Sequence, residues 1–232
     1  MNAYKKFAYY YDEVMSTLEY DLWYDFTLPY LKNGDKTLDL ACGTGILSTM
    51  LKLKGFDAEG LDLSDTIIEI ALEKAKINHL NIPFYVADMT NFHLNKKYDV
   101  ITCYFDSVNF LKTKKDIDNM FKCVLEHLNP NGYFIFDIFS KEMMAEYENN
   151  HLEEDYHTFK IDWKTKKQDH KTLKHDITIY EGDYILKENY YEYYHELKSL
   201  NLDGFKLIKI CGDFNDDLQP EDERILVVLQ KL

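Results

Sequence analysis

Short apolar runs alternate with segments of helical periodicity over the first 140 residues of the chain. The apolar runs predict strands at 37–41, 56–63, 83–87, 98–104 and 133–138. Helical spacing of apolar side chains predicts helices within residues 1–32 and at 46–54, 66–76 and 114–128. Mostly apolar strands that alternate with helices indicate a parallel sheet with helices on both faces.

The alternation breaks after Ser140. The segments expected there are a helix at 141–152, antiparallel strands at 156–163, 173–180 and 184–191, a helix at 193–202, and last strands at 205–211 and 224–229. We therefore expect one domain from residues 1–140 and 191–232, in which residues 1–32 form a helical lid. Residues 141–190 are expected to form an inserted β-rich subdomain that covers a substrate.

Charge and cysteine spacing narrow the classes of function. The 232 residues include 27 Lys and Arg against 41 Asp and Glu, and the net charge of -14 argues against nucleic acid or an anionic membrane as the main partner. No stretch approaches the roughly 20 apolar residues that span a bilayer. The cysteines form no CxxC pair and the histidines show no ligand spacing, so we expect free thiols, no metal and a cytoplasmic location. The oligomeric state is open.

A glycine turn, DLACGTG (39–45), follows the first expected strand and precedes a helix. Such a turn lets the backbone approach a cofactor at the carboxyl end of a strand. It matches the dinucleotide fingerprint only in part, because Ser48 stands at the last position, and the Asp39 carboxylate suits an ammonium group better than a pyrophosphate. The pattern favours a cofactor with an amino-acid tail. Asp62 and Asp88 follow the next two strands, where they would accept hydrogen bonds from a ribose and from an adenine amino group.

The chain resembles the class I S-adenosylmethionine-dependent methyltransferases in LDLACGTG (38–45), GLDLS (60–64), ADMTNF (87–92), YDVITCYFDSVNFL (98–111) and LNPNGYFIFDI (128–138). The order of these motifs is similar to the small-molecule subgroup, which includes uncharacterised bacterial methyltransferases and sugar-amine N,N-dimethyltransferases. The resemblance implies an α/β fold with a Rossmann-like seven-stranded, mostly parallel sheet, an antiparallel last strand, and a small antiparallel β insert after strand five. It implies S-adenosylmethionine as cofactor and methyl transfer to a nitrogen or oxygen of a small molecule.

The resemblance also implies site residues. Those expected to line the cofactor are Tyr11, Tyr20, Trp23, Asp39, Ala41, Gly43, Gly45, Asp62, Leu63, Asp88, Met89 and Phe105. Asp106 and Tyr11 are the catalytic candidates. Asp106 would orient or deprotonate the acceptor, or would only cap the following helical turn, and Tyr11 would aim its hydroxyl at the acceptor or only pack. Asp137 is a weaker candidate.

The excess of acidic over basic residues favours a neutral or cationic small-molecule acceptor. The tyrosines of residues 184–194 allow either an aromatic cage for a cation or ordinary strand packing. Two other functions fit parts of the pattern: an NAD(P)-dependent oxidoreductase, and a catalytically idle S-adenosylmethionine-binding regulatory protein.

Overall fold

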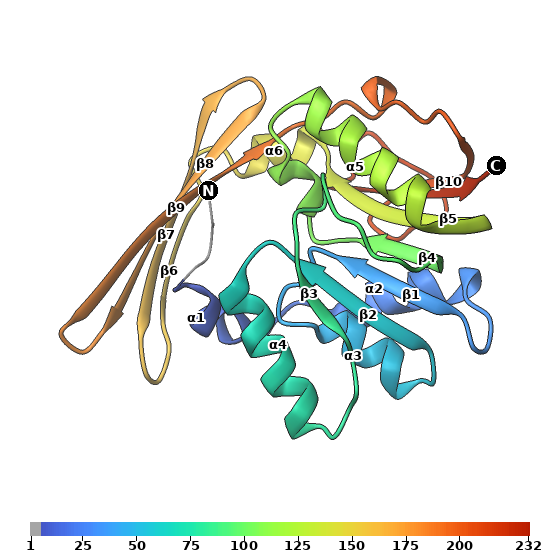
Figure 1. Ribbon diagram of the computed structural model, residues 1–232. Helices are drawn as coiled ribbons and strands as arrows, with labels where there is room; N and C mark the ends of the chain where they lie inside the picture. Colours follow the sequence, from blue (N-terminus) through green and yellow to red (C-terminus); the bar gives the residue numbers. More distant parts are fainter. Residues whose placement is uncertain (1–5) are drawn as a thin grey trace.

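A computed structural model describes residues 6–232, which form a large and a small β-sheet (Figure 1). The large sheet has seven strands in the order β10-β11-β5-β4-β1-β2-β3. These strands are β1 (Lys36–Leu40), β2 (Asp57–Asp62), β3 (Phe84–Val86), β4 (Tyr98–Cys103), β5 (Leu128–Phe139), β10 (Phe205–Gly212) and β11 (Arg224–Lys231). The strands from β3 to β5 pair in parallel, and β11 is antiparallel to both of its neighbours. The expected fold class is confirmed.

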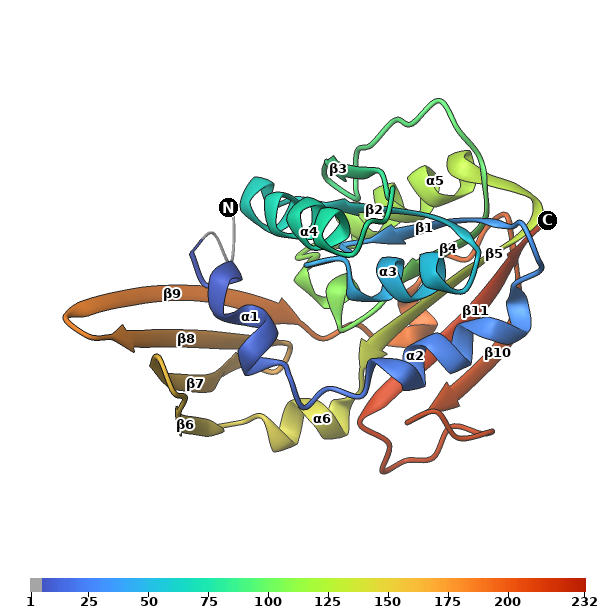
Figure 2. The same ribbon diagram turned by 90° about the horizontal axis from the view of Figure 1, so that it is seen from below.

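Helices cover both faces of the large sheet (Figure 2). The helices are α1 (Ala8–Val14), α2 (Tyr20–Thr27), α3 (Ile46–Leu53), α4 (Asp65–Ile77), α5 (Lys114–His127) and α6 (Lys141–Glu146), with short 3-10 turns η1 (Leu28–Tyr30), η2 (Ser107–Phe110) and η3 (Leu197–Ser199). On one face, Met120 and Phe121 of α5 pack against β5. On the other face, Trp23 of α2 and Leu51 of α3 pack against the central strands. Burial of these apolar stripes holds the layers together.

Local sequence signals explain where several helices begin and end. The Ser64 side chain accepts a hydrogen bond from the backbone of Ile67 and caps α4. Thr113 and Asp116 form a capping box at the start of α5. Pro29 lies in η1, where the chain leaves the α-helical path of α2.

The small sheet has four antiparallel strands, β6 (His151–Asp155), β7 (Lys160–Asp169), β8 (Thr172–Glu181) and β9 (Tyr184–Tyr193). It projects from one side of the large sheet, and α1 lies against it (Figures 1 and 2). Phe7 is fully buried between them and meets the Trp163 ring edge to face, with ring centroids 5.8 Å apart. The expected lid therefore contacts the small sheet, although its residues 1–5 lie outside the described part.

Three expectations beyond Ser140 were wrong. The helix expected at 141–152 ends at Glu146, and the strand expected from Tyr156 begins at Lys160 because Tyr156 and Phe159 close a turn. The helix expected at 193–202 is absent from the described chain, apart from η3. Tyr193 pairs with Thr172 of β8, and the Tyr194 amide donates to the Lys171 carbonyl. Pairing with β8 thus overrides the local helical periodicity.

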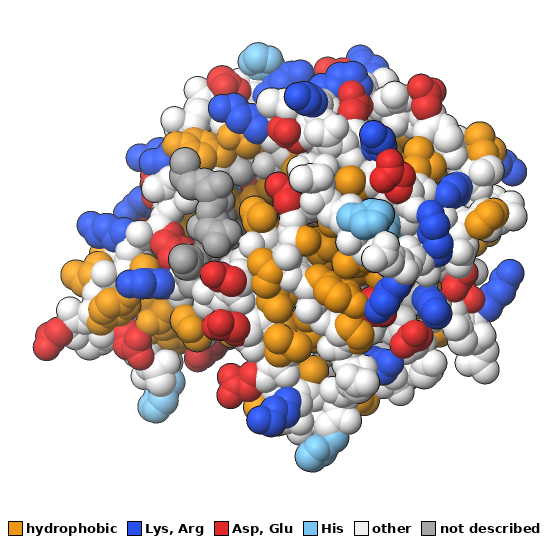
Figure 3. Space-filling model, in the orientation of Figure 1, with side chains coloured by type: hydrophobic (Ala, Val, Ile, Leu, Met, Phe, Trp, Pro, Cys, Tyr) orange, Lys and Arg blue, Asp and Glu red, His pale blue; other side chains and the backbone are white. Residues whose placement is uncertain are grey.

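The described residues, 6–232, contain no helix of the length and hydrophobicity that crossing a membrane requires. Figure 3 shows hydrophobic side chains on the face where α4 and β3 lie, with charged side chains around them. The exposed apolar residues of these two elements include Leu72, Ile77 and Val86. Exposed apolar residues of this kind are ordinary on a folded domain.

Candidate functional site

A cavity of about 600 Å³ opens where β1, β2 and β4 end, and α1 and the small sheet complete its walls. The expected site residues that line it are Tyr11, Tyr20, Asp39, Ala41, Gly43, Asp62, Leu63, Asp88, Met89, Phe105 and Asp106. The carboxyl ends of parallel strands meet at one edge of a sheet, so residues far apart in sequence converge there. The cavity has one half at the glycine turn and a second half at the small sheet.

The glycine turn is shaped by left-handed backbone and by Asp62. Ala41 and Gly43 have φ of 52° and 54°, and no atom lies within 4 Å of the place that a side chain on Gly43 would take. Asp62 Oδ2 accepts a hydrogen bond from the Gly43 amide at 3.1 Å, and Oδ1 accepts one from Ser64 at 2.9 Å. Burial raises the pKa of Asp62, and these backbone donors oppose that shift.

Asp39 lies beneath the same turn and is 4% exposed. Its carboxylate accepts hydrogen bonds from Thr102 at 2.9 Å and from Ser48 at 3.2 Å. Burial raises the pKa of Asp39 to about 7, against the effect of these two hydroxyls. Hydrogen bonds from neutral hydroxyls leave its negative charge uncompensated, which suits a cationic ligand group.

Asp88, Met89 and Leu63 lie at the far end of this half of the cavity. Asp88 is exposed, and its Oδ1 accepts hydrogen bonds from the backbone and hydroxyl of Thr90 at 2.8 and 2.7 Å. Leu63 is half exposed and offers an apolar surface. This end therefore combines an apolar wall with an oriented carboxylate, a combination that fits an adenine ring.

Trp23 and Gly45 are not among the residues that line the cavity. Trp23 is buried, its indole N–H donates to Asp137 at 2.6 Å, and its ring centroid lies 4.3 Å from that of Phe105. Gly45 precedes α3 with φ of 77°, and a side chain there would lie 2.6 Å from the Phe84 ring. Both residues thus pack behind the cavity wall and do not line it.

Asp106 is held by an arginine that the sequence patterns did not single out. Arg224 of β11 donates from both terminal nitrogens to the Asp106 carboxylate, at 2.7 and 3.0 Å, and lies 3.1 Å from Asp137. Asp106 makes no side-chain cap to η2, so the expected capping role is wrong. Burial raises the pKa of Asp106 to about 7, while Arg224 opposes the shift.

Asp106 is therefore an ion-paired carboxylate, which weakens its case as the base that deprotonates the acceptor. A signal for Arg224 did exist, since it is the single arginine of the chain. Asp137, the weaker candidate, is fully buried and accepts hydrogen bonds from the amides of Phe105 and Asp106. These bonds hold both residues in the left-handed conformation, with φ of 58° and 59°.

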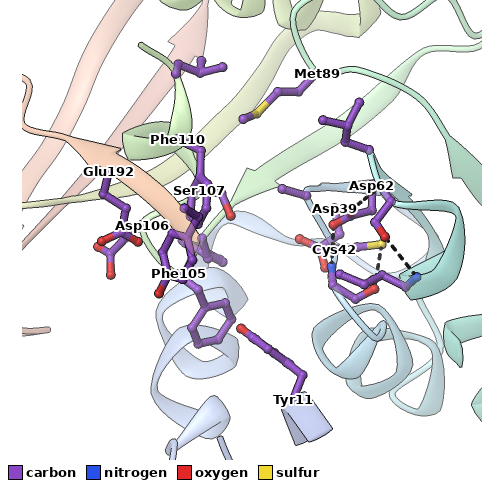
Figure 4. Close-up of a pocket in the computed structure, with 18 of the residues that line it drawn as sticks. Tyr11, Asp39, Cys42, Asp62, Met89, Phe105, Asp106, Ser107, Phe110 and Glu192 are labelled. Atoms are coloured by element: carbon purple, nitrogen blue, oxygen red, sulfur yellow. Dashed lines mark hydrogen bonds between the residues drawn. The ribbon is translucent and has the colours of Figure 1, made fainter. Parts of the chain in front are cut away.

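Helix α1 is tied to the glycine turn by a polar cluster. Asp12 accepts a hydrogen bond from Thr44 at 2.5 Å and pairs with Lys74 of α4 at 2.7 Å, and Lys74 also lies 3.1 Å from Thr44. Tyr11 points from α1 toward Phe105 across the cavity (Figure 4). Burial raises the pKa of Tyr11 above its ordinary value, so the hydroxyl keeps its proton.

The second half of the cavity is lined by residues of the small sheet, including Trp163, His175, Tyr190 and Glu192. Glu192 lies beside Asp106, and Phe110 and Ser107 stand next to them (Figure 4). Sequence reasoning did not select His175, which lies in an alternating strand pattern typical of any antiparallel sheet, or Glu192, which lies just after the strand expected at 184–191.

Residues 37–132 match the family model of a methyltransferase domain. A protein of Geobacillus sp. (strain WCH70), provisionally named as a methyltransferase, is 28% identical over 246 residues, which cover 99% of this chain and 100% of that protein. A dTDP-4-amino-2,3,4,6-tetradeoxy-D-glucose N,N-dimethyltransferase of Saccharopolyspora spinosa is 29% identical over 107 residues, 46% of this chain and 41% of that enzyme.

Among solved structures, an S-adenosylmethionine-dependent methyltransferase from Clostridium acetobutylicum ATCC 824 is similar with a TM-score of 0.85 and 28% identity, over 99% of both chains. The family model gives no support to the nicotinamide alternative. These matches confirm the resemblance that the motifs indicate, and identify the chain as an S-adenosylmethionine-dependent methyltransferase with its methyltransferase domain at residues 37–132.

Proposed function

We propose that this enzyme transfers the methyl group of S-adenosylmethionine to an amine nitrogen of a small molecule. The observation that carries this proposal is the charge of the second half of the cavity. Asp106, Asp137 and Glu192 lie in or beside it with Arg224 as their cationic partner, which leaves an excess of negative charge. An amino group compensates that excess, whereas an anionic acceptor would add to it.

The N,N-dimethyltransferase of Saccharopolyspora spinosa supports an amine acceptor, since its name describes the methylation of an amino sugar. The match covers less than half of each chain, so it suggests the type of acceptor atom and leaves the acceptor's identity undefined. A cavity of about 600 Å³ is of the size that small-molecule sites have.

The first half of the cavity fits S-adenosylmethionine. Asp39 would hold its ammonium group beside the open glycine turn, and Asp62 would accept hydrogen bonds from the ribose. Asp88 and Met89 would meet the adenine edge. When bound, the cofactor supplies a methyl group on a positively charged sulfur.

The enzyme's own residues bind, orient and exclude water. Tyr11 and Phe105 face each other between the two halves and narrow the space through which the acceptor approaches (Figure 4). The tie between Asp12, Thr44 and Lys74 holds α1 over the site. In-line transfer depends chiefly on such positioning, because a well-aligned nucleophile needs little covalent help. We propose that residues 1–32 act as the lid and that the small sheet covers the acceptor.

The proposal is tested by incubating the enzyme with methyl-labelled S-adenosylmethionine and paired acceptors: benzylamine with benzyl alcohol, and glucosamine with glucose. We expect label in the amines and little in the matched alcohols. Transfer to the alcohols alone would refute an amine acceptor. Calorimetric binding of S-adenosylhomocysteine without transfer to any acceptor would favour the idle regulatory protein.

The location of the enzyme is also a proposal. All four cysteines, Cys42, Cys103, Cys123 and Cys211, are buried free thiols. Free thiols are typical of a reducing compartment, so we propose that the enzyme works in the cytoplasm. Thiol titration of the unfolded protein, isolated under non-reducing conditions, should find four reactive groups.

A further inference from the structure

His175 is buried in the small sheet and is fixed by aromatic neighbours. It is 3% exposed and stacks on Tyr190, with ring centroids 4.3 Å apart and an interplanar angle of 1°. The indole N–H of Trp163 donates to Nδ1 of His175 at 3.1 Å, and the Thr165 hydroxyl lies 3.1 Å from the same nitrogen. Because an indole nitrogen only donates, Nδ1 is the acceptor and a neutral imidazole carries its proton on Nε2.

That second nitrogen faces Glu192. His175 Nε2 lies 2.9 Å from Glu192 Oε2, and the Glu192 side chain is 15% exposed. Trp163 thus sets the tautomer of His175, and Nε2 lies close to the Glu192 carboxylate without the alignment of a hydrogen bond. In the part of the chain that the structure describes, the Glu192 side chain makes no other ion pair, and Glu192 lines the cavity, so its second oxygen is available there.

Glu192 differs in this respect from the two other carboxylates near it. Asp106 accepts hydrogen bonds from both terminal nitrogens of Arg224. Asp137 pairs with Arg224 and accepts a hydrogen bond from the Trp23 indole. Among residues 6–232, the one ion-pair contact of the Glu192 side chain is with His175, whose imidazole is neutral when Nδ1 accepts from Trp163. A partly buried carboxylate with no cation is costly, and a ligand that brings a positive charge relieves that cost.

The surroundings of Glu192 suit an organic ammonium group. The Phe110 and Tyr190 rings stack at a centroid distance of 5.4 Å, and Trp163 meets Tyr190 edge to face at 6.1 Å. These aromatic residues line the same half of the cavity as Glu192. His175 and Phe110 both stack on Tyr190, so these rings form an apolar wall beside the carboxylate. A carboxylate in such surroundings binds an alkylammonium better than it binds a neutral alcohol.

We propose that Glu192 is the residue that binds the amino group of the acceptor, and that His175 is its positioning residue. This inference rests on the proposed amine methylation and names the side chain that recognises the amine. Glu192 accepts an N–H hydrogen bond through the oxygen that His175 does not face. The acceptor is thereby held in the half of the cavity that adjoins the cofactor.

The test compares E192Q with the wild type in steady-state methyl transfer to benzylamine and glucosamine. We expect KM for the amines to rise about tenfold or more in E192Q, because a charge-assisted hydrogen bond is replaced by a neutral one. The Kd of S-adenosylhomocysteine should stay unchanged, which also shows that the variant is folded. Asp176→Asn is the matched control, since Asp176 lies on the opposite face of β8 from His175 and pairs with Lys174.

Two substitutions separate positioning from packing at His175. His175→Gln keeps an amide N–H near the place of Nε2, whereas His175→Leu removes it, and both lose the acceptor for Trp163. We expect KM for the amine to stay near the wild-type value in the Gln variant and to rise in the Leu variant.

An equal KM in E192Q and the wild type, with amines still methylated, would overturn this inference and leave the proposed function standing. Equal effects of the Gln and Leu substitutions would overturn the positioning role of His175. Methylation of alcohols alone would instead refute the proposed function itself.

Discussion

Arg224→Met tests the importance of the buried charge cluster behind the cavity. The side chains of Arg224 and Asp106 are each 14% exposed, and Asp137 is fully buried. Removing the guanidinium leaves two carboxylates facing each other without a cation, which costs about 3–5 kcal/mol. A domain of this size has a total stability of about 5–15 kcal/mol, so the loss is a large fraction of it. The melting temperature should fall by roughly 6–20 °C.

Urea unfolding followed by tryptophan fluorescence measures the loss in the free energy of unfolding. Trp23 reports on the region around Arg224, because the guanidinium lies 5.1 Å from its ring centroid. The loss should be larger at pH 8 than at pH 6. Burial already raises the pKa of Asp106 to about 7, and removing Arg224 raises it further, so protonation at the lower pH relieves the unpaired charge. Lys209→Met on β10 is the control for loss of a surface cation. A loss below about 1 kcal/mol would refute the view that Arg224 neutralises a buried pair.

Three further predictions concern the first half of the cavity, at the glycine turn. Asp62→Ala should weaken S-adenosylhomocysteine binding in calorimetry by about tenfold or more, since hydrogen bonds to a charged carboxylate are lost; an unchanged Kd would exclude its ribose role. Wild-type affinity should rise between pH 6 and pH 8, because Asp39, with a pKa of about 7, must be charged to hold an ammonium group. If the Kd of Asp39→Asn changes with pH as steeply as the Kd of the wild type, Asp39 is not the group that holds the ammonium. Lys74→Met breaks the pair with Asp12 and should speed cofactor release in stopped-flow traces; an unaltered rate would show that α1 is held by other contacts.

The parallel sheet and its glycine turn were predictable because their signals are local. An apolar run, a turn and a helix mark the units that begin with β1 and β2, and CGTG is the turn of the first. β1, β2 and β4 lie within one or two residues of the expected ranges. The carboxylates Asp39, Asp62 and Asp88 were found because each directly follows or ends such a strand. Their convergence follows from the common direction of parallel strands.

The segment beyond Ser140 was predicted less well, because antiparallel pairing depends on partners far along the chain. Tyr193 and Tyr194 belong to a segment with a helical pattern, yet their backbone lies beside β8 and its turn. The Tyr194 amide donates to the Lys171 carbonyl, and the Tyr193 carbonyl accepts a hydrogen bond from the Asn109 side chain. Local periodicity contains no information about those partners.

The sequence by itself determined the fold class, the cofactor type and the edge of the sheet at which the candidate site residues gather, since these follow from short contiguous motifs. Only the tertiary structure decided which side chains line the second half of the cavity. It brings Arg224 of the last strand against Asp106, and it places Glu192 of the small sheet beside them. These contacts join residues that no motif links, and their energies arise from burial and charge pairing, which exist only once the chain has folded.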